Sequence, residues 1–507
     1  MQERRHTAAD SRQRATAFLA FIACAIVAFA AVRPASSSSA SGAATFDIVI
    51  LNGRVIDPES KLDAVRNLGI NGGKIQAIST TTLQGRTVID AKGLVVAPGF
   101  IDLHAHGQTP ENYEHQAMDG VTTALELEIG VSDIDKFYAE RDGKAAINYG
   151  ASVGHVPARM KVMRDPSMSL PSGDAAHRQA TDDEIRQMKE ILERGLQRGA
   201  PAVGFGIQYT HSASRWEILQ MFEIAAKYGA ACHIHIRDMA ENEPANSLQA
   251  LGEVIAAAAI TGAPLHVVHI SSMGLRAVPK LLHMISAAQK RGLDVTTECY
   301  PYTAGMTDLS SAIFDDGWEK RMGITYKDLQ WTATGERLTA ETFAQYRKGG
   351  GMVVLHTIPE EIMQIAVASP LTMIASDGFL QDGKGHPRSS GTYCRVLGHY
   401  VRETKTLTLM QAINKMTLMP AKRLERLAPM MKHKGRIRIG ADADITVFDP
   451  NTVIDKATYE QPANYSEGMK DVLVNGKFVV KDGQLQSGAT PGRPIRGMIR
   501  KGSDASY

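Results

Sequence analysis

The sequence has few cysteines and almost no net charge. Four cysteines in 507 residues exclude a small scaffold held together by disulfide bonds. With 56 Lys+Arg against 54 Asp+Glu, the formal net charge is only +2, which argues against a general nucleic-acid-binding protein. Glycine (45) and proline (21) are close to average, which excludes a collagen-like or largely disordered chain. What remains is a long globular chain, 44% hydrophobic, with ample material for a core.

Residues 1–44 differ in composition from the rest. Arginines precede an apolar run over residues 15–32, and a Ser-rich stretch of small residues follows it. This order is typical of a secretory signal peptide. The apolar run is also about long enough to span a bilayer, so an N-terminal membrane anchor stays open as an alternative. We therefore expect an exported protein, periplasmic or extracellular, with the anchor as an open variant.

Both ends of the remaining chain show the same pattern of short apolar runs separated by turns. Asn52-Gly53 and Asn71-Gly72 separate such runs in residues 46–95, and Asn475-Gly476 does so in residues 430–495. Asn-Gly between apolar runs indicates a β-hairpin. We predict one small β-sandwich domain built from residues 46–95 and 430–495.

Between these segments, residues 96–429 alternate short apolar runs with helical stretches. This alternation predicts parallel βαβ units, and the length fits a (β/α)8 TIM-type barrel. A doubly wound sheet is the alternative, but no Gly-rich phosphate loop follows any predicted strand. Residues 303–350 are polar and irregular, which predicts an insertion over the barrel mouth.

Potential ligand residues stand at the ends of four predicted strands. They are His104 and His106 in one segment, His235, His269 and Asp377. Two histidines at positions i and i+2 of a strand point to the same face. Strand ends converge on one mouth of a barrel, and imidazole and carboxylate groups bind Zn²⁺ and similar metals. The four segments together predict a metal site.

These four segments resemble the amidohydrolase superfamily of metal-dependent hydrolases. Further segments resemble its N-acyl-D-amino-acid deacylase (D-aminoacylase) branch: 300–305 (YPYTAG), 386–388 (HPR), 391–403, 440–444 (GADAD) and 474–476 (VNG). The resemblance extends from about residue 46 to residue 497 and implies a metal-dependent barrel with zinc, as one or two divalent ions.

The resemblance also implies roles for individual residues. His104 and His106 match ligands of one metal, with Asp377 on the same metal, and His235 and His269 match ligands of the tightly held metal. Arg388 matches the arginine that binds the substrate carboxylate. Tyr209 and Tyr302 match tyrosines near the substrate's carboxylate and its scissile carbonyl.

The sequence departs from the family where a bridging ligand is expected. In the D-aminoacylase branch a cysteine bridges the metals, but residues 123–130 contain no cysteine. In many other members of the superfamily a carboxylated lysine does so, but residues 204–209 contain no lysine. Glu128 stands at the end of a buried strand, with Glu126 on the same face. A buried carboxylate is costly unless it is paired or bound to metal. We predict that Glu128 is the bridging ligand, with Glu126 as second candidate and a salt-bridged core glutamate as the alternative.

Two further residues, Ser271 and His155, stand at positions that the family resemblance also covers. Ser271 occupies the position of a lysine in the branch, so it is a substrate-binding candidate, and the loss of the lysine weakens the case for a free substrate carboxylate. Arg388 could bind such a carboxylate alone. His155 follows a glycine in a turn that resembles the branch, and we leave open whether it lines the active site or has a structural role.

We expect a metal-dependent hydrolase of linear amide C–N bonds, with a small-molecule amide as substrate and no nucleic-acid partner. Water activated by the metal attacks the carbonyl, and Asp377 acts as general base and then as general acid. A cyclic-amide hydrolase of the dihydroorotase or hydantoinase type and a D-residue dipeptidase are the alternatives. A non-catalytic exported binding protein is disfavoured, because Asp377 and both histidines of the first segment are present.

Overall fold

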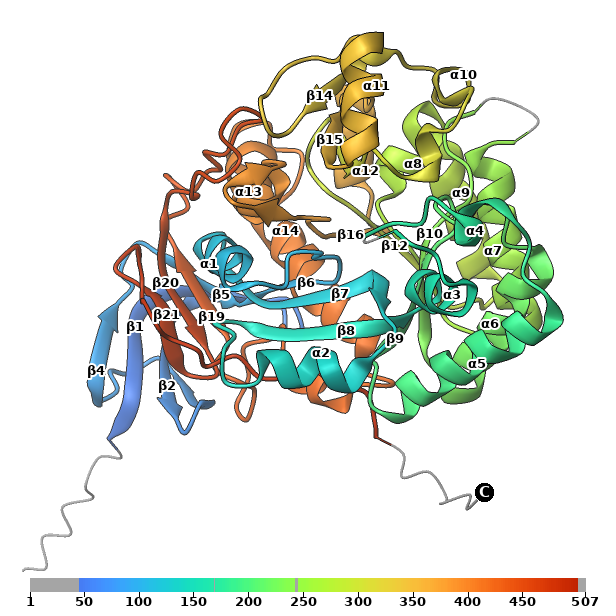
Figure 1. The fold of residues 1–507 in the computed structure, drawn as a ribbon. Coiled ribbons are helices and arrows are strands. Elements are labelled where there is room, and N and C mark those ends of the chain that lie inside the picture. Colours follow the sequence, from blue (N-terminus) through green and yellow to red (C-terminus); the bar gives the residue numbers. More distant parts are fainter. Residues whose placement is uncertain (1–44, 168, 242–244, 500–507) are drawn as a thin grey trace, which may run out of the picture. The chain divides into compact units, whose positions relative to one another are not determined.

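Eight parallel strands form the centre of the fold in the computed structural model, which describes residues 45–499 except 168 and 242–244 (Figure 1). Their order is β6 (Phe100–Asp102), β7 (Val121–Val131), β8 (Asn148–Gly154), β9 (Ala202–Gly206), β10 (Ala231–His235), β11 (Leu265–Val267), β12 (Val295–Cys299) and β16 (Thr372–Ile374). A parallel bridge between Ala105 and Gly378 links the segments that follow the first and last strands. The predicted barrel is therefore confirmed, and the doubly wound alternative is wrong.

Helices pack around the barrel strands. They are α1 (Pro110–Met118), α2 (Ile134–Arg141), α3 (His155–Met163), α4 (Asp174–His177), α5 (Asp182–Gln197), α6 (Arg215–Tyr228), α7 (Ser247–Thr261), α8 (Ile270–Gly274), α9 (Val278–Lys290), α12 (Glu360–Ala368), α13 (Arg388–Arg395), α14 (Leu409–Met416) and α15 (Leu418–Leu424). Their ends follow the sequence: Thr181 and Glu184 form a capping box at the start of α5, and Gly229 ends α6 in the left-handed region.

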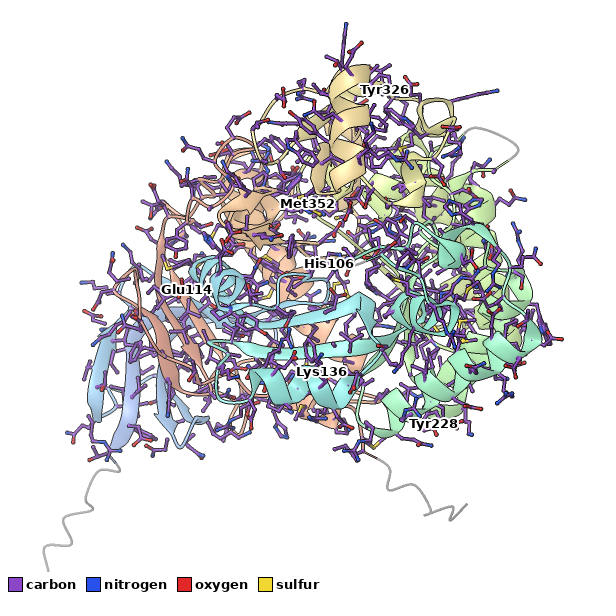
Figure 2. The ribbon with its side chains drawn as sticks, viewed as in Figure 1. His106, Glu114, Lys136, Tyr228, Tyr326 and Met352 are labelled. Atoms are coloured by element: carbon purple, nitrogen blue, oxygen red, sulfur yellow. The ribbon has the colours of Figure 1, made fainter. Side chains whose placement is uncertain are left out.

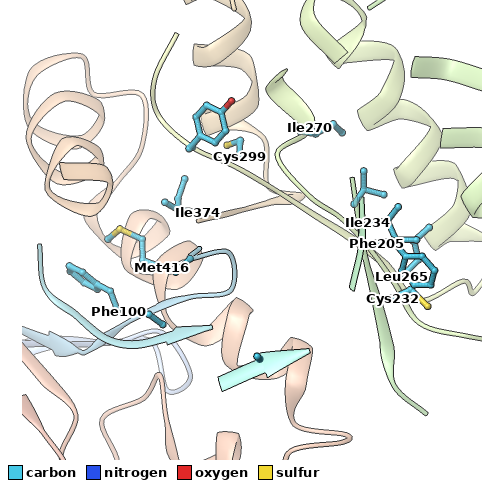
Figure 3. Packing of buried hydrophobic residues seen from close by; sticks show 14 of the residues in the cluster. Phe100, Phe205, Cys232, Ile234, Leu265, Ile270, Cys299, Ile374 and Met416 are labelled. Carbon is cyan, nitrogen blue, oxygen red and sulfur yellow. The ribbon is translucent and has the colours of Figure 1, made fainter. Parts of the chain in front are cut away.

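The main core lies between the strands and these helices. Phe205, Ile234 and Leu265 come from neighbouring strands and are fully buried (Figure 3). Cys232 and Cys299 lie in the same core as free cysteines, in agreement with the absence of a disulfide framework. Among the described residues, no helix has the length and apolar character that a membrane crossing requires. The predicted signal or anchor over residues 1–44 lies outside the described residues.

A second sheet joins strands from both chain ends, which confirms the expected small β domain. It contains β1 (Phe46–Asp57), β2 (Leu62–Asn71), β3 (Lys74–Ser79), β4 (Gly85–Asp90), β5 (Val95–Pro98), β19 (Ile445–Phe448), β20 (Met469–Val474), β21 (Lys477–Lys481) and β22 (Gln484–Leu485). Hydrogen bonds connect all nine strands into one sheet, and the antiparallel pair β5–β19 joins the two halves.

Two of the three predicted hairpin turns occur as expected. Asn475 and Gly476 both have positive φ (50° and 76°) between β20 and β21, as a two-residue hairpin turn requires. The turn after Asn71 connects β2 and β3. The hairpin expected at Asn52-Gly53 is wrong: β1 continues through it, with a register shift against β2. Both halves of β1 pair with the same strand, so the left-handed Asn52 produces a bulge and not a reversal.

The stretch expected to be irregular forms a small substructure between β12 and β16. We call residues 305–355 the cap. It contains the sheet β13 (Gly305–Asp308), β15 (Met352–Leu355) and β14 (Leu329–Trp331), with α10 (Trp318–Met322) and α11 (Ala340–Gly349). Phe314, Trp318 and Phe343 pack in its own apolar cluster. This cluster includes Tyr209 from the barrel, so the cap packs against the barrel mouth.

Candidate active site

Six predicted ligand residues meet at the carboxyl ends of the barrel strands. Because parallel strands all end at the same mouth, segments far apart in sequence converge there. His104 and His106 follow β6, Glu128 lies on β7, His235 ends β10, His269 follows β11 and Asp377 follows β16. The side chain of His106 is 23% exposed and the others are more deeply buried.

Glu128 lies at the centre of this cluster. Its Oε2 is 3.1 Å from Nε2 of His104 and 3.2 Å from Nε2 of His106. Its Oε1 is 2.7 Å from Nδ1 of His235 and 3.2 Å from Nε2 of His269. Within the described part of the chain, every ion-pair partner of Glu128 is a histidine. One carboxylate therefore faces two pairs of imidazoles, which is the arrangement that a bridging ligand needs.

Asp377 is the second carboxylate of the cluster. Its Oδ1 lies 3.4 Å from Nε2 of His104 and 3.2 Å from Nε2 of His106, and its Oδ2 lies 2.9 Å from Nη1 of Arg388. Burial alone would raise the pKa of Asp377, but the guanidinium of Arg388 and the ring of His104 outweigh it and lower the pKa. Asp377 is therefore a carboxylate at neutral pH.

The backbone at two site residues is in the left-handed region. Asp377 has φ 52° and His269 has φ 30°, values that non-glycine residues rarely adopt. The amide of Asp377 donates to the carbonyl of His104 at 2.7 Å, which holds the turn in place. Strain of this kind is typical of functional sites.

Two further glutamates contact the outer nitrogens of the first two histidines. Nδ1 of His106 is 2.6 Å from Oε2 of Glu126, and Nδ1 of His104 is 2.7 Å from Oε1 of Glu298. Glu126 also accepts hydrogen bonds from the amides of Ile129 and Gly130. Glu126 thus orients His106 and does not face the cluster itself.

Glu298 is a residue of the site that was not predicted from the sequence. It is fully buried on β12, and its Oε2 lies 2.9 Å from Nε2 of His266. The signal was present, because a carboxylate within a short buried strand needs a partner, as Glu126 and Glu128 do.

The arrangement fits a divalent metal. Because Nδ1 of both rings faces a carboxylate, each Nε2 presents its lone pair, and the two Nε2 atoms of His104 and His106 face each other at 3.1 Å. Convergent lone pairs beside two carboxylates favour a cation between them. Two groups have ligand atoms within 4.8 Å of one another: His104, His106 and Asp377, and His104, Glu128 and His269. Nitrogen and oxygen donors of this kind suit zinc.

A cavity of about 280 Å³ lies over the cluster, between the barrel and the cap. Figure 2 labels one residue of each side, His106 from the barrel and Met352 from the cap. Arg388 lines the cavity as the first residue of α13, with its guanidinium 4.5 Å from the centre of the Tyr300 ring. Nε and Nη1 of Arg388 are buried, and neither has a hydrogen-bond partner in the described structure, although Nη1 forms the ion pair with Asp377.

The structure separates the two predicted tyrosines. Tyr209 lines the cavity, with its hydroxyl 3.1 Å from Oγ1 of Thr307 on the cap. Tyr302 does not line it, because its hydroxyl donates to Asp455 at 3.0 Å. Tyr300 lines the cavity in its place. The two residues are two positions apart in a segment without regular structure, so their directions could not be predicted from sequence spacing.

Neither Ser271 nor His155 faces the cavity. Ser271 is buried in α8, and its neighbour Ser272 lines the cavity in its place, because consecutive helix residues point in different directions. Nε2 of His155 lies 2.8 Å from Glu217, which also forms a buried ion pair with Arg159. Of the two readings left open for His155, its contacts support the structural one.

Comparisons with known proteins cover nearly the whole described chain. The sequence model described as the amidohydrolase family matches residues 87–480. D-aminoacylase of Alcaligenes xylosoxydans xylosoxydans is 30% identical over 503 residues, which cover 90% of this chain and 99% of the relative.

Two solved structures extend the comparison to the fold. N-acyl-D-glutamate deacylase of Bordetella bronchiseptica, complexed with zinc and a phosphonate mimic of the tetrahedral intermediate, has a TM-score of 0.77 and 28% identity, covering 89% of this chain and 100% of that chain. A D-aminoacylase structure described by its binuclear metal center has a TM-score of 0.76 and 26% identity, with the same coverage.

Proposed function

The chain belongs to the amidohydrolase family, and on this basis we propose that it is a zinc-dependent hydrolase of linear amide C–N bonds that acts on N-acyl-D-amino acids. The observation that carries the proposal is the position of Glu128. Its two oxygens face two separate pairs of histidines, with Asp377 beside one pair. The relatives act on N-acyl-D-amino acids according to their names, and they match over almost their full length.

Six side chains would hold the metal. His104, His106 and Asp377 would bind one ion, His235 and His269 the other, and Glu128 would bridge them. Zinc in such a site lowers the pKa of a bound water and polarises a carbonyl oxygen. Glu126 and Glu298 keep the first two rings in the tautomer with Nε2 turned to the site.

The proton transfers fall to Asp377. Its lowered pKa keeps it ionised at neutral pH, so that a carboxylate oxygen is free to take a proton from water as the water oxygen bonds to the amide carbon. The same carboxyl group then gives the proton to the nitrogen as the C–N bond breaks, so that a carboxylic acid and an amine form; the acid's proton then passes to the amine, and a carboxylate and an ammonium leave. Arg388 pairs with Asp377 through Nη1, and the positive charge of its guanidinium at the cavity wall would attract the carboxylate of the substrate.

The test is release of amine from N-acetyl-D-amino acids by the purified, zinc-loaded protein. We expect hydrolysis in the wild type and a loss of at least about a thousandfold in kcat for Asp377→Asn, which removes the proton acceptor but keeps the shape. Unfolding midpoint and bound zinc serve as controls that the variant is folded and loaded.

Parallel assays with hydantoin and with dipeptides ending in a D-residue examine the alternatives. Faster turnover of either, or full activity in Asp377→Asn, would contradict the proposal. A protein that binds these compounds without converting any of them would be the non-catalytic alternative.

We also propose that residues 1–44 export the protein, on the basis of their charged, apolar and Ser-rich segments in that order. Cell fractionation of the full chain, followed by N-terminal sequencing, tests this. Soluble periplasmic or extracellular protein with a new N-terminus indicates cleavage, and full-length membrane-bound protein indicates the anchor. Recovery of full-length protein in the cytosol would contradict export.

A further inference from the structure

We infer that the half of the cavity under the cap selects substrates whose group on that side of the amide is bulky and uncharged. This inference rests on the proposed function and names the substrate class of the same site. We assign the amino-acid side chain to this half; the acyl group also flanks the scissile bond, and the two substrate series below distinguish them.

Apolar side chains gather in that half, beside the polar Thr307 and Asp308 of the cap. Six of the residues that form it are Leu170, Met239, Met306, Ile313, Met352 and Leu355. Three of the six are methionines, whose unbranched, polarizable side chains adapt to groups of different shape. A chamber with such walls gains free energy from burying an apolar group and offers a charged group no hydration.

The charges of the cavity support the same conclusion. Among the described residues that line it, Arg388 is the one lysine or arginine, and its guanidinium lies against Asp377 at the barrel side. The cap contributes one charged residue, Asp308, whose Oδ1 already accepts hydrogen bonds from the amide and hydroxyl of Ser310.

A second carboxylate on the substrate would therefore have no cation to pair with. If Arg388 binds the carboxylate common to all N-acyl amino acids, the side-chain carboxylate of a glutamate derivative would lie in an apolar chamber beside Asp308. An unpaired buried charge is strongly disfavoured. The relative of known structure that acts on N-acyl-D-glutamate thus differs from this chain in the substrate that we assign.

The experiment compares kcat/KM in two substrate series on the zinc-loaded full chain. The first series keeps the acetyl group and varies the D-amino acid through alanine, leucine, phenylalanine, glutamate and lysine. The second keeps D-alanine and varies the acyl group through acetyl, hexanoyl and benzoyl. We expect the leucine derivative to exceed the glutamate and lysine derivatives by at least about a hundredfold. The series in which added apolar bulk raises kcat/KM at least tenfold over its smallest member identifies the group that fills the chamber.

Variants then test the charge argument directly. Met352→Lys and, separately, Met306→Lys place an ammonium in the chamber from positions that are partly exposed, where a lysine can be accommodated. Each should raise the ratio of glutamate to leucine turnover at least tenfold. The matched control is Met498→Lys, at a surface position 45% exposed, which should leave the ratio unchanged.

The outcomes separate the two proposals. Hydrolysis of none of the compounds would overturn the proposed function. Hydrolysis with equal or greater activity on the glutamate or lysine derivative would overturn this inference alone. The inference would also be overturned if the wild-type enzyme had its highest kcat/KM on the smallest member of each series.

Discussion

Removal of the Glu298 carboxylate should weaken zinc binding without any change in a zinc ligand. Glu298 is 1% exposed, and its two oxygens lie 2.7 Å from Nδ1 of His104 and 2.9 Å from Nε2 of His266. Burial would raise its pKa, but the rings of His266 and His104 outweigh burial and lower the pKa, so the group is a carboxylate. It holds His104 in the tautomer that turns the Nε2 lone pair to the site.

The magnitude follows from these two contacts. Glu298→Ala leaves two buried ring nitrogens without partners, at about 1–3 kcal/mol each, so the free energy of unfolding should fall by about 2–6 kcal/mol. Loss of a partner that orients a metal-binding histidine typically reduces metal affinity by about 10–100-fold. Glu298→Gln should lower the free energy of unfolding and the zinc affinity by less, because its amide oxygen still accepts a hydrogen bond from one ring. His266 can take the other tautomer, in which Nε2 accepts from the amide nitrogen of the glutamine and Nδ1 donates to the hydroxyl of Thr296, 2.7 Å away.

Two measurements test this prediction. Chelator competition gives the zinc affinity, and urea unfolding of the metal-free protein gives the free energy of unfolding. A matched control is Glu217→Ala, because Glu217 is also a fully buried carboxylate that contacts a histidine, but it lies away from the cavity. The control should lose stability by about 3–5 kcal/mol and keep its zinc affinity. If folded Glu298→Ala bound zinc as tightly as the wild type, the argument from tautomer control would be refuted.

Three further outcomes are expected. Glu128→Ala should lower the bound zinc per chain, as measured by elemental analysis, because no other residue that the structure describes faces both histidine pairs; unchanged stoichiometry would place the bridge elsewhere. Removal of zinc by a chelator should lower the melting temperature, and zinc at 100 times its Kd should restore about 2.7 kcal/mol of stability; equal melting with and without zinc would contradict a folded-state metal site. Burial raises the pKa of Asp119 to about 7, outweighing its hydrogen bonds from Cys394 and Tyr393. Since the folded state then holds a proton that the unfolded chain loses above about pH 4, the free energy of unfolding should decrease as the pH rises from about 4 to about 7. Asp119→Asn should show a weaker decrease in urea unfolding at pH 5 and pH 8, and an identical slope would refute the assignment.

Features that depend on neighbours in sequence could be predicted. Alternating strand and helix patterns are local, and so are turns such as Asn475-Gly476, where both residues have positive φ. The positions of His104, His106, His235, His269 and Asp377 at strand ends were enough to predict one cluster, because parallel strands in a barrel must end at one mouth.

Local patterns misled where pairing or direction decides the outcome. Asn52-Gly53 has the composition of a hairpin turn, yet both flanking segments pair with β2, and a bulge results. Tyr300 and Tyr302 stand in the same short segment, and the contact with Asp455, 153 positions away, turns Tyr302 out of the cavity. The cap likewise has its own apolar core, which its polar composition concealed.

The sequence was sufficient to identify the barrel, the β domain from both chain ends and the residues that could bind a metal, because periodicity and strand ends are properties of the chain itself. Tertiary contacts alone separated Glu128, whose oxygens face four histidines, from Glu126, whose side chain pairs only with His106 among the histidines of the described chain. The same contacts revealed Glu298 and placed Met352 over the site. The reason is physical: residues on one strand face share a direction, but their partners come from distant segments that only the closed barrel and the cap bring within reach.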